Sequence, residues 1–312
     1  MNAMIFAAGR GTRLKPLTDI LPKALVPVGD KPLLQHVLDR VASLPSFATV
    51  PVGSPSGIAL TPGAEESRVI VNVHHFGSQI INFIRLAQPH YPFSISISDE
   101  RQQLLETGGA IKKARSMFVK GQPVLIHNCD ILSNADLASL YASAAETSDC
   151  SATQELEKAD ESSRVGATLL VSDRKTTRYL LFDKDMRLVG WTNIQTGEVK
   201  SPHPDIHQRI DRGELTMYAF SGIHVISQTL FPLMDQEPDA FPIIDFYLKH
   251  CATFTIRGVL QPNLRLLDVG KLDTLEQASE FLSQSSFGPV GSSQYKAATV
   301  PCGSPQGKIP TI

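Results

Sequence analysis

Apolar positions in the first half of the chain follow two alternating patterns. Short apolar runs of strand length alternate with longer stretches in which apolar residues recur every three or four positions. The first pattern is typical of buried strands, and the second is typical of amphipathic helices. Strands are expected at 3–8, 69–73, 93–97 and 124–127, and helices at 32–44, 76–86, 108–118 and 134–145. Strands that alternate with helices favour an α/β fold with a mostly parallel sheet and helices on both faces.

The second half is less regular and predicts a mixed extension of the same sheet. Strands are expected at 167–171, 179–182, 217–226, 254–259 and 265–269, and helices at 241–250 and 272–282. Three stretches, 45–68, 147–164 and 193–213, are rich in turn-forming or charged residues and are expected to be loops. Loops of this length are uncommon in compact domains, so each is interpreted as functional or mobile. The segment 284–312 is rich in Ser, Gly and Pro, and we expect it to be a disordered tail.

Composition is that of a globular protein and excludes several classes of partner. Hydrophobic residues make up 42% of the 312 positions, which is enough for a sizeable core. The net charge is −2, and Lys and Arg form no run longer than a pair, so an extended nucleic-acid surface is not expected. The four cysteines lack a CxxC spacing and are expected to be reduced thiols. Neither a signal peptide nor a membrane-spanning run is visible, so a cytoplasmic protein without a membrane partner is expected.

The most informative segment is the loop after the first expected strand, within FAAGRGTRLKPLTDILPKAL at 6–25. Gly9 and Gly11 allow backbone N–H groups to approach phosphate oxygens. Arg13 can bind two such oxygens through its planar guanidinium group, and Lys23 adds a second positive charge. Two prolines restrict the backbone, so little order has to be acquired on binding. The segment therefore predicts a polyphosphate site.

Neither of the two commonest phosphate-binding motifs fits this loop. A dinucleotide-binding loop would need glycine where Leu14 stands, and no G-x-x-x-x-G-K-[ST] run occurs in the chain. The segment instead resembles the GxGxRLxPLTxxxPKxL signature of the sugar-1-phosphate nucleotidylyltransferases. The run LLETGGA at 104–110 is similar to the branch that includes N-acetylmuramate-1-phosphate uridylyltransferases and bacterial enzymes like mannose-1-phosphate guanylyltransferase.

This resemblance implies a Rossmann-like fold of the nucleotide-diphospho-sugar transferase (GT-A-like) type, in a single domain at 1–283. Its nucleotide-binding half would be 1–146, and its sugar-binding half would be 165–283. The implied reaction transfers a nucleotidyl group from a nucleoside triphosphate to a sugar 1-phosphate by in-line attack on the α-phosphate, and releases pyrophosphate. The implied partners are these two substrates, and a homodimer is an assembly that the resemblance allows. Supply of cell-envelope precursors is the role that the family suggests.

The resemblance also assigns residues to the site. Arg13 and Lys23 are the expected catalytic cations. The nucleotide is expected to contact Ala8, Gly9, Gly11, Thr12, Asn72, His75 and Gly108. The sugar is expected at Trp191, Asn193 and Gly222, although Trp191 fits a buried core position equally well. The E-K-P run that many of these enzymes carry near the sugar is absent, so the sequence leaves the sugar open, as it does the base.

Asp130 and Asp268 each follow an apolar run and are candidates for binding one Mg²⁺. Carboxylates at strand ends can converge although they are far apart in the sequence. Mg²⁺ prefers one or two carboxylates together with water and phosphate oxygens. A turn or a helix cap is the alternative role for each aspartate. The resemblance assigns both to the metal.

Two other functions stay open at this point. An enzyme of the same fold could act on a non-sugar phosphate, as a phosphocholine cytidylyltransferase does, but the sequence does not indicate the aromatic cage that choline needs. A non-catalytic regulatory protein that binds a nucleotide sugar is the other alternative. The presence of both cations and both aspartates argues against it.

Overall fold

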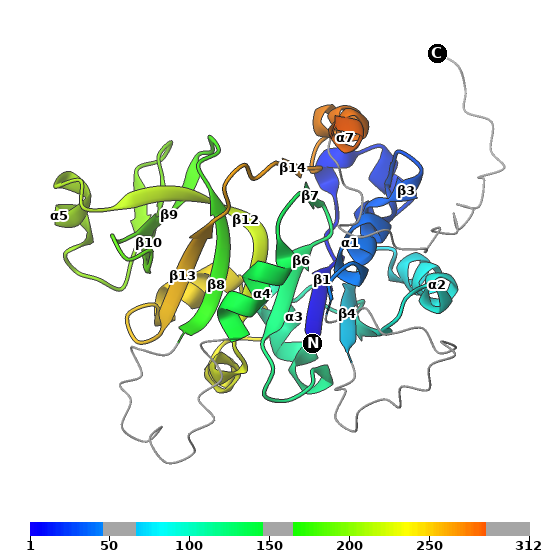
Figure 1. Ribbon diagram of the computed structural model, residues 1–312, viewed down its shortest axis with the longest axis horizontal. Helices are drawn as coiled ribbons and strands as arrows, with labels where there is room; N and C mark the ends of the chain where they lie inside the picture. The colour runs from blue at the N-terminus through cyan, green and yellow to red at the C-terminus, as the bar shows by residue number, and fades with distance from the viewer. Residues whose placement is uncertain (46–66, 146–164, 285–312) are drawn as a thin grey trace.

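The computed structural model describes residues 1–45, 67–145 and 165–284 (Figure 1). The loops expected at 45–68 and 147–164 therefore lie almost entirely outside the described residues. The tail expected at 284–312 lies outside them beyond Gln284.

A single ten-stranded sheet runs through the molecule in the order β11-β10-β9-β12-β6-β1-β4-β5, with β8 paired to β12 and β13 paired to β8. Its first four strands in chain order are parallel: β1 (Asn2–Phe6), β4 (Arg68–Val73), β5 (Ser94–Asp99) and β6 (Val124–Asn128). β12 (Thr216–Ile226) joins β6 in antiparallel orientation and leads the sheet into the second half. This arrangement confirms the expected α/β fold with a mixed sheet.

The remaining strands of this sheet belong to the second half of the chain (Figure 1). They are β8 (Val165–Ser172), β9 (Arg178–Phe182), β10 (Leu188–Asn193), β11 (Glu198–Lys200) and β13 (Thr255–Leu260). All pair in antiparallel orientation except β13, which is parallel to β8.

Helices cover both faces of the sheet because side chains alternate between its faces along each strand. Ala3 and Ile5 pack into a core with α1 (Leu33–Ala42), α2 (Gly77–Ala87) and α4 (Leu137–Ala145). Met4 points the other way, into a second core. That core contains α3 (Glu106–Ala114), the 3₁₀ helix η7 (Gln228–Gln236) and α6 (Ile243–His250). Two 3₁₀ turns, η4 (Gln88–His90) and η5 (Arg115–Met117), extend α2 and α3.

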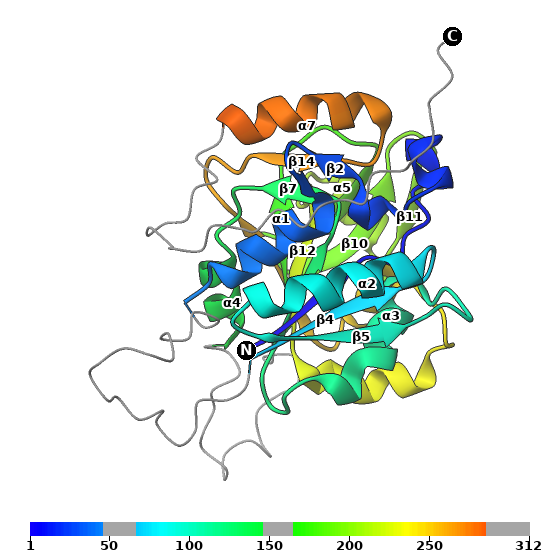
Figure 2. The same ribbon diagram turned by 90° about the vertical axis from the view of Figure 1, so that its right-hand side faces the viewer.

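A third, smaller core lies above the end of the sheet (Figure 2). There α7 (Leu272–Gln284) packs over two short hairpin-like pairs. One pair joins β2 (Pro27–Val28) to β3 (Lys31–Pro32), and the other joins β7 (Ile131–Ser133) to β14 (Leu266–Asp268). The second pair connects the two halves of the chain.

The expected loop at 193–213 is wrong, because this segment contains regular structure. It starts with the turn of the β10–β11 hairpin, in which the Gly197 N–H donates to the Asn193 carbonyl at 2.8 Å. It ends with the helix α5 (Ile206–Asp211). Ile206 is the buried residue of α5 and packs against β9 and β10. A helix of six residues with one buried side chain has no detectable period.

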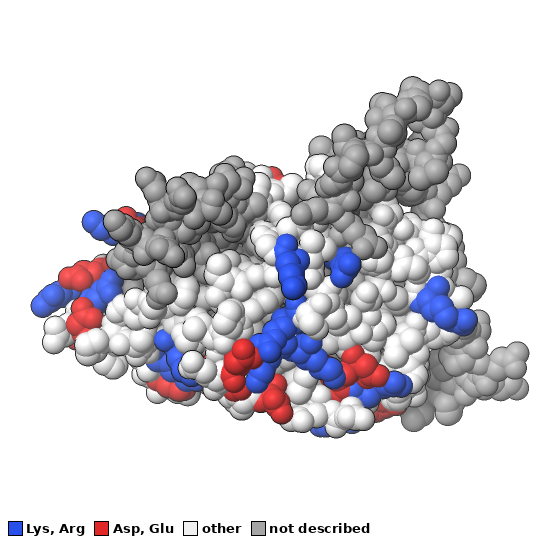
Figure 3. All heavy atoms as spheres, turned by 90° about the horizontal axis from the view of Figure 1, so that it is seen from below, with Lys and Arg blue, Asp and Glu red and all other residues white. Residues whose placement is uncertain are grey.

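Charges on the surface are mixed in sign. Figure 3 shows Lys and Arg lying beside Asp and Glu on the face seen from below. Lys112–Asp239, Arg115–Asp235 and Lys249–Glu237 are ion pairs of this kind. No helix among the described residues is long and apolar enough to cross a membrane.

Candidate active site

The glycine loop leaves β1 at Phe6 and is held in place by its own contacts. Gly11 has a φ of +64°, and a Cβ there would lie 2.8 Å from Thr18 Cγ2 and 2.9 Å from Lys23 Cβ. The Thr18 hydroxyl donates to the Gly11 carbonyl at 2.9 Å. Three short 3₁₀ turns follow, η1 (Thr12–Leu14), η2 (Leu17–Asp19) and η3 (Lys23–Leu25). Leu14 is buried in the core beneath α7, which fixes the middle of the segment.

A cleft of about 390 Å³ opens beside this loop. Its walls come from the carboxyl ends of β1, β4 and β6 and from the segment that leads from β5 into α3. They are formed by Phe6, Ala8, Gly9, Lys23, Asn72, Glu100, Leu104, Glu106, Thr107, Asn128, Cys129 and Asp130. Ligands of open α/β sheets bind at this edge. The cleft therefore brings together the expected Ala8, Gly9, Lys23, Asn72 and Asp130.

Asp130 follows β6 directly and forms an ion pair with Lys23. The two side chains are only 18% and 11% exposed, respectively, so little water screens the pair. The pairing of β14 with β7 places Asp268 opposite Ile131, and the Val269 N–H donates to the Asp130 carbonyl at 2.8 Å. Strand pairing thus brings together two aspartates that are far apart in the sequence.

Asp268 lies in a crowded, charged environment. Burial raises the pKa of its carboxyl group, and the nearby Asp130 raises it further, while Lys23, Arg13 and Arg174 oppose the shift. Its Oδ1 is buried without a hydrogen-bond partner within the described part of the chain. A Cβ at position 270 would lie 2.7 Å from this oxygen and 2.8 Å from Arg13 Nη2. Glycine at 270 therefore leaves room for the Arg13 guanidinium group beside Asp268.

Two carboxylates, one with an unpartnered oxygen, are a donor set that suits Mg²⁺. Within the described residues, no third His, Cys, Asp or Glu joins them as a cluster of metal ligands. Mg²⁺ in phosphate-transfer sites takes its remaining ligands from water and substrate. The residues present therefore fit the expected ion.

Asn72 and Glu100 form a buried polar link between strand ends. The Asn72 side chain accepts the Ala7 N–H at 2.8 Å and donates to Glu100 Oε1 at 2.9 Å. Glu100 is 1% exposed, and burial raises the pKa of its carboxyl group, an effect opposed by its hydrogen bonds to Asn72 and to the Leu105 N–H. The sequence prediction missed Glu100. Its position directly after a strand, next to Asp99, is the signal that could have indicated it.

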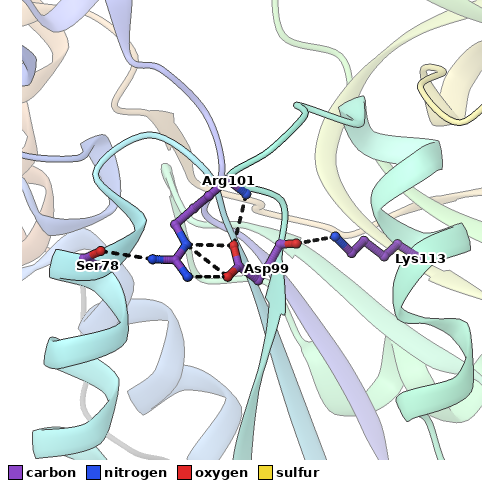
Figure 4. Close-up of polar contacts among 4 residues, drawn as sticks. All are labelled: Ser78, Asp99, Arg101 and Lys113. Carbon is purple, nitrogen blue, oxygen red and sulfur yellow. Dashed lines mark hydrogen bonds and ion pairs between the residues drawn. The ribbon is translucent and has the colours of Figure 1, made fainter.

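Asp99 has other partners. Its carboxylate accepts three hydrogen bonds from the Arg101 guanidinium group, which also donates to Ser78 (Figure 4). The Lys113 ammonium group donates to the Asp99 carbonyl. These contacts hold the end of β5 between α2 and α3.

His75 and Gly108 do not line the cleft. The His75 ring contacts the Thr18 carbonyl through Nε2 at 3.3 Å, so it helps to hold the segment that follows Gly11. The Gly108 N–H donates to the Phe241 carbonyl at 2.8 Å, and a Cβ at 108 would lie 2.2 Å from the Phe241 ring. The group that approaches Gly108 closely is thus Phe241 of this chain. Nucleotide contacts of these two residues stay predictions.

The three expected sugar contacts are spread over the second half. Gly222 borders the cleft, because a Cβ there would lie 2.7 Å from Nδ2 of the cleft residue Asn128. Trp191 and Asn193 do not line it. Trp191 is half-buried against the second core with the Lys200 Nζ 5.3 Å from its ring centroid, and the Asn193 side chain accepts the Gln195 N–H at 3.1 Å. Their sugar contacts stay predictions.

A loop with two glycines and two cations lies beside paired carboxylates at the carboxyl edge of the parallel strands of the sheet. This arrangement is typical of α/β proteins that bind phosphates. Residues 2–175 match the nucleotidyl transferase family, which is more than half of the chain. The chain therefore belongs to the nucleotidyl transferase family.

Two curated relatives are N-acetylmuramate alpha-1-phosphate uridylyltransferases. The one from Caulobacter vibrioides is 39% identical over 129 residues, which are 41% of this chain and 45% of that protein. The one from Neisseria meningitidis serogroup B is 33% identical over 144 residues, which are 46% of this chain and 53% of that protein. The chain thus spans about half the length of these relatives.

A solved structure shares the fold. It is a protein provisionally assigned as a glucose-1-phosphate thymidylyltransferase from Bacillus anthracis, in complex with a sucrose. It superposes with a TM-score of 0.64 over 92% of this chain and 97% of that chain, at 16% sequence identity.

Proposed function

We propose that this protein transfers a nucleotidyl group from a nucleoside triphosphate to a sugar 1-phosphate, and that it releases pyrophosphate. One observation carries the proposal. The ion-paired Lys23 and Asp130 line a cleft at the glycine loop, and Asp268 with Arg13 beside it lies close to this pair. The names of the two uridylyltransferase relatives support the same class of reaction.

The chain's own residues can position two anions for this reaction. Gly9 has open space where a side chain would stand, so a triphosphate can approach the backbone there. Arg13 would neutralise the β- and γ-phosphates of the nucleotide. Lys23 would lie nearer the α-phosphate and the incoming sugar phosphate, because its ammonium group is already held at Asp130.

The chemistry needs little more than positioning and charge. The attacking oxygen belongs to a phosphate that is already an anion, so no strong general base is required. The barrier arises from bringing two anions together and from charge on the departing pyrophosphate. Fixed cations in a partly buried site lower both contributions.

Mg²⁺ is the cofactor that we propose for this site. Asp130 and Asp268 would hold it, because their carboxylates are brought together by strand pairing and the buried Oδ1 of Asp268 has no hydrogen-bond partner among the described residues. When bound, such an ion stabilises negative charge on phosphate oxygens. We further propose a cytoplasmic enzyme that supplies nucleotide sugars for the cell envelope, because N-acetylmuramate appears in the names of both relatives.

The test is pyrophosphate release in the presence of Mg²⁺. UTP, CTP, GTP, dTTP and ATP are each combined with N-acetylmuramate, N-acetylglucosamine, glucose, mannose and heptose 1-phosphates. We expect one dominant pair, with UTP and N-acetylmuramate 1-phosphate tried first. Absence of turnover over the whole grid, with nucleotide binding still measurable, would contradict the proposal and favour a regulatory protein that binds nucleotide sugars.

A further inference from the structure

Arg174 is a cation that the sequence prediction did not include, and it lies just beyond β8. β8 pairs with β12, and the register of this pairing shifts between Phe220 and His224. Within the shift, Gly222 takes a φ of +79°, so β12 bulges at this point. The Arg174 Nη2 donates to the Phe220 carbonyl at 3.1 Å, at the start of the bulge.

The same bulge reaches the cleft. Gly222 lies against the side chain of Asn128, which lines the cleft directly before Cys129 and Asp130. Arg174 is also close enough to Asp268 for its charge to oppose the raised pKa of that carboxyl group, as the charge of Arg13 does. Arg174 therefore approaches the paired aspartates from the second half of the chain, whereas Arg13 and Lys23 approach from the glycine loop.

The three cations of this region differ in their interaction partners. Lys23 is ion-paired with Asp130, and Arg13 lies beside Asp268 at Gly270. Arg174 is exposed, and no carboxylate of the described residues forms an ion pair with it. A guanidinium group has five N–H donors, and the Phe220 carbonyl takes one of them.

We propose that Arg174 binds the phosphate group of the second substrate, the sugar 1-phosphate. This inference rests on the proposed function, and it names the residue that receives the incoming anion. Arg174 has free donors in a planar arrangement that matches two phosphate oxygens. It belongs to the second half of the chain, so it stays available when the nucleotide occupies the glycine loop in the first half. It orients the sugar phosphate and reduces its repulsion from the triphosphate.

The kinetic test compares the wild type with Arg174→Ala, Arg174→Lys and the control Lys175→Ala, which removes a neighbouring exposed cation. With the pair that the grid identifies, Arg174→Ala should raise the KM for the sugar 1-phosphate about 10- to 100-fold, as expected for a lost charge-assisted hydrogen bond. The KM for the nucleotide should change less than about twofold. The KM of Arg174→Lys for the sugar 1-phosphate should lie between those of the wild type and Arg174→Ala. Lys175→Ala should behave like the wild type.

Two kinetic outcomes would overturn the inference. One is an unchanged KM for the sugar 1-phosphate in Arg174→Ala. The other is an equal rise in both KM values, because a merely structural role at the bulge would affect both substrates.

A binding test separates this inference from the proposed function. Inorganic phosphate is titrated by calorimetry into protein that is already saturated with pyrophosphate, so that the glycine loop is occupied. We expect phosphate binding to the wild type and to Lys175→Ala, and binding at least tenfold weaker to Arg174→Ala. If no substrate pair is turned over, this pattern still supports a phosphate site at Arg174. Equal binding by all variants, or no binding by any, would overturn it.

Discussion

Two glycines of the glycine loop have different physical reasons for being glycine. At Gly11, φ is +64°, and a Cβ would collide with the side chains of Thr18 and Lys23. This glycine is required by the fold. At Gly9, a Cβ would meet nothing within 4 Å. The fold therefore gives no steric reason for glycine at this position, and on the proposed function the open space would let a phosphate approach the backbone.

Alanine substitutions should separate these two roles. Gly11→Ala should lower the free energy of unfolding by more than about 1 kcal/mol, because it combines a left-handed backbone with a steric clash. Gly9→Ala should leave the free energy of unfolding within about 0.5 kcal/mol of the wild type and still weaken nucleotide binding at least tenfold. Urea unfolding and titration with UTP measure the two effects. Unchanged nucleotide affinity in Gly9→Ala would show that the open space is not a phosphate site.

The two aspartates should each be indispensable for turnover. Asp130→Asn and Asp268→Asn keep the shape of the side chain and remove its charge. Each should lower kcat by about 10² or more if the carboxylates hold Mg²⁺. Asp136→Asn, which removes an exposed carboxylate near the start of α4, is the control and should keep wild-type activity. Near-normal Mg²⁺-dependent turnover in either site variant would refute the metal assignment.

At the scale of elements, the site depends on how the ends of neighbouring strands are aligned. β1, β4 and β5 are parallel, so their carboxyl ends meet at one edge. Asn72 at the end of β4 binds the backbone of Ala7 after β1 and the carboxylate of Glu100 after β5. One carboxamide group therefore fixes the start of the glycine loop relative to two other strands.

Removal of this carboxamide should lower the free energy of unfolding. Asn72→Ala leaves the Ala7 N–H and Glu100 Oε1 buried without their partner, and we expect a loss of about 1–3 kcal/mol or more in the free energy of unfolding. Asn82→Ala is a matched control, because Asn82 is exposed on α2 and should cost less than about 0.5 kcal/mol. Urea unfolding measures both. Equal stability of the two variants would mean that the link does not support the loop.

The elements that could be predicted from the sequence are those in which the spacing of apolar residues within the element itself indicates a strand or a helix. The parallel strands, α1, α2 and α6 have long apolar runs or clear helical periods. β11 and α5 could not be predicted, because turn residues such as Asn193 and Gly197 mark a tight hairpin as readily as a loop. Glu100 and Arg174 were missed for a different reason. The role of Glu100 depends on an asparagine in another strand, so its place at a strand end is only a weak local signal. The position of Arg174 depends on a bulge in another strand, which leaves no signal near Arg174 in the sequence.

At the scale of the whole molecule, the second core, which contains α3 and α6, includes two polar side chains that have no hydrogen-bond partner among the described residues. His224 on β12 and Tyr247 on α6 meet edge to face, with ring centroids 5.6 Å apart. Burial lowers the pKa of His224 to about 3. The folded protein thus keeps this histidine neutral at pH values at which the unfolded chain takes up a proton.

The sign of the pH dependence follows from this difference. A histidine with a lowered pKa in the folded state contributes stability above its ordinary pKa of about 6.5, and this contribution is lost as the pH falls. His224→Phe removes that loss and also removes two unpartnered nitrogens. Relative to the wild type, the variant should gain about 2 kcal/mol in the free energy of unfolding when the pH is lowered from about 6.5 to 5. Urea unfolding at the two pH values tests this, and parallel pH profiles would contradict it.

The pairing of β14 with β7 has a consequence for incomplete chains. β7 belongs to the first half, and β14 comes close to the end of the described residues. A chain interrupted between Asp130 and Leu266 keeps the residues of the glycine loop, Arg13, Lys23 and Asp130, but lacks the second carboxylate, Asp268. On the proposed function, a stalled or proteolysed fragment is therefore at most a nucleotide binder without turnover. On that function, catalytic activity would arise only after Asp268 has been synthesised, and truncated copies would not consume nucleoside triphosphate.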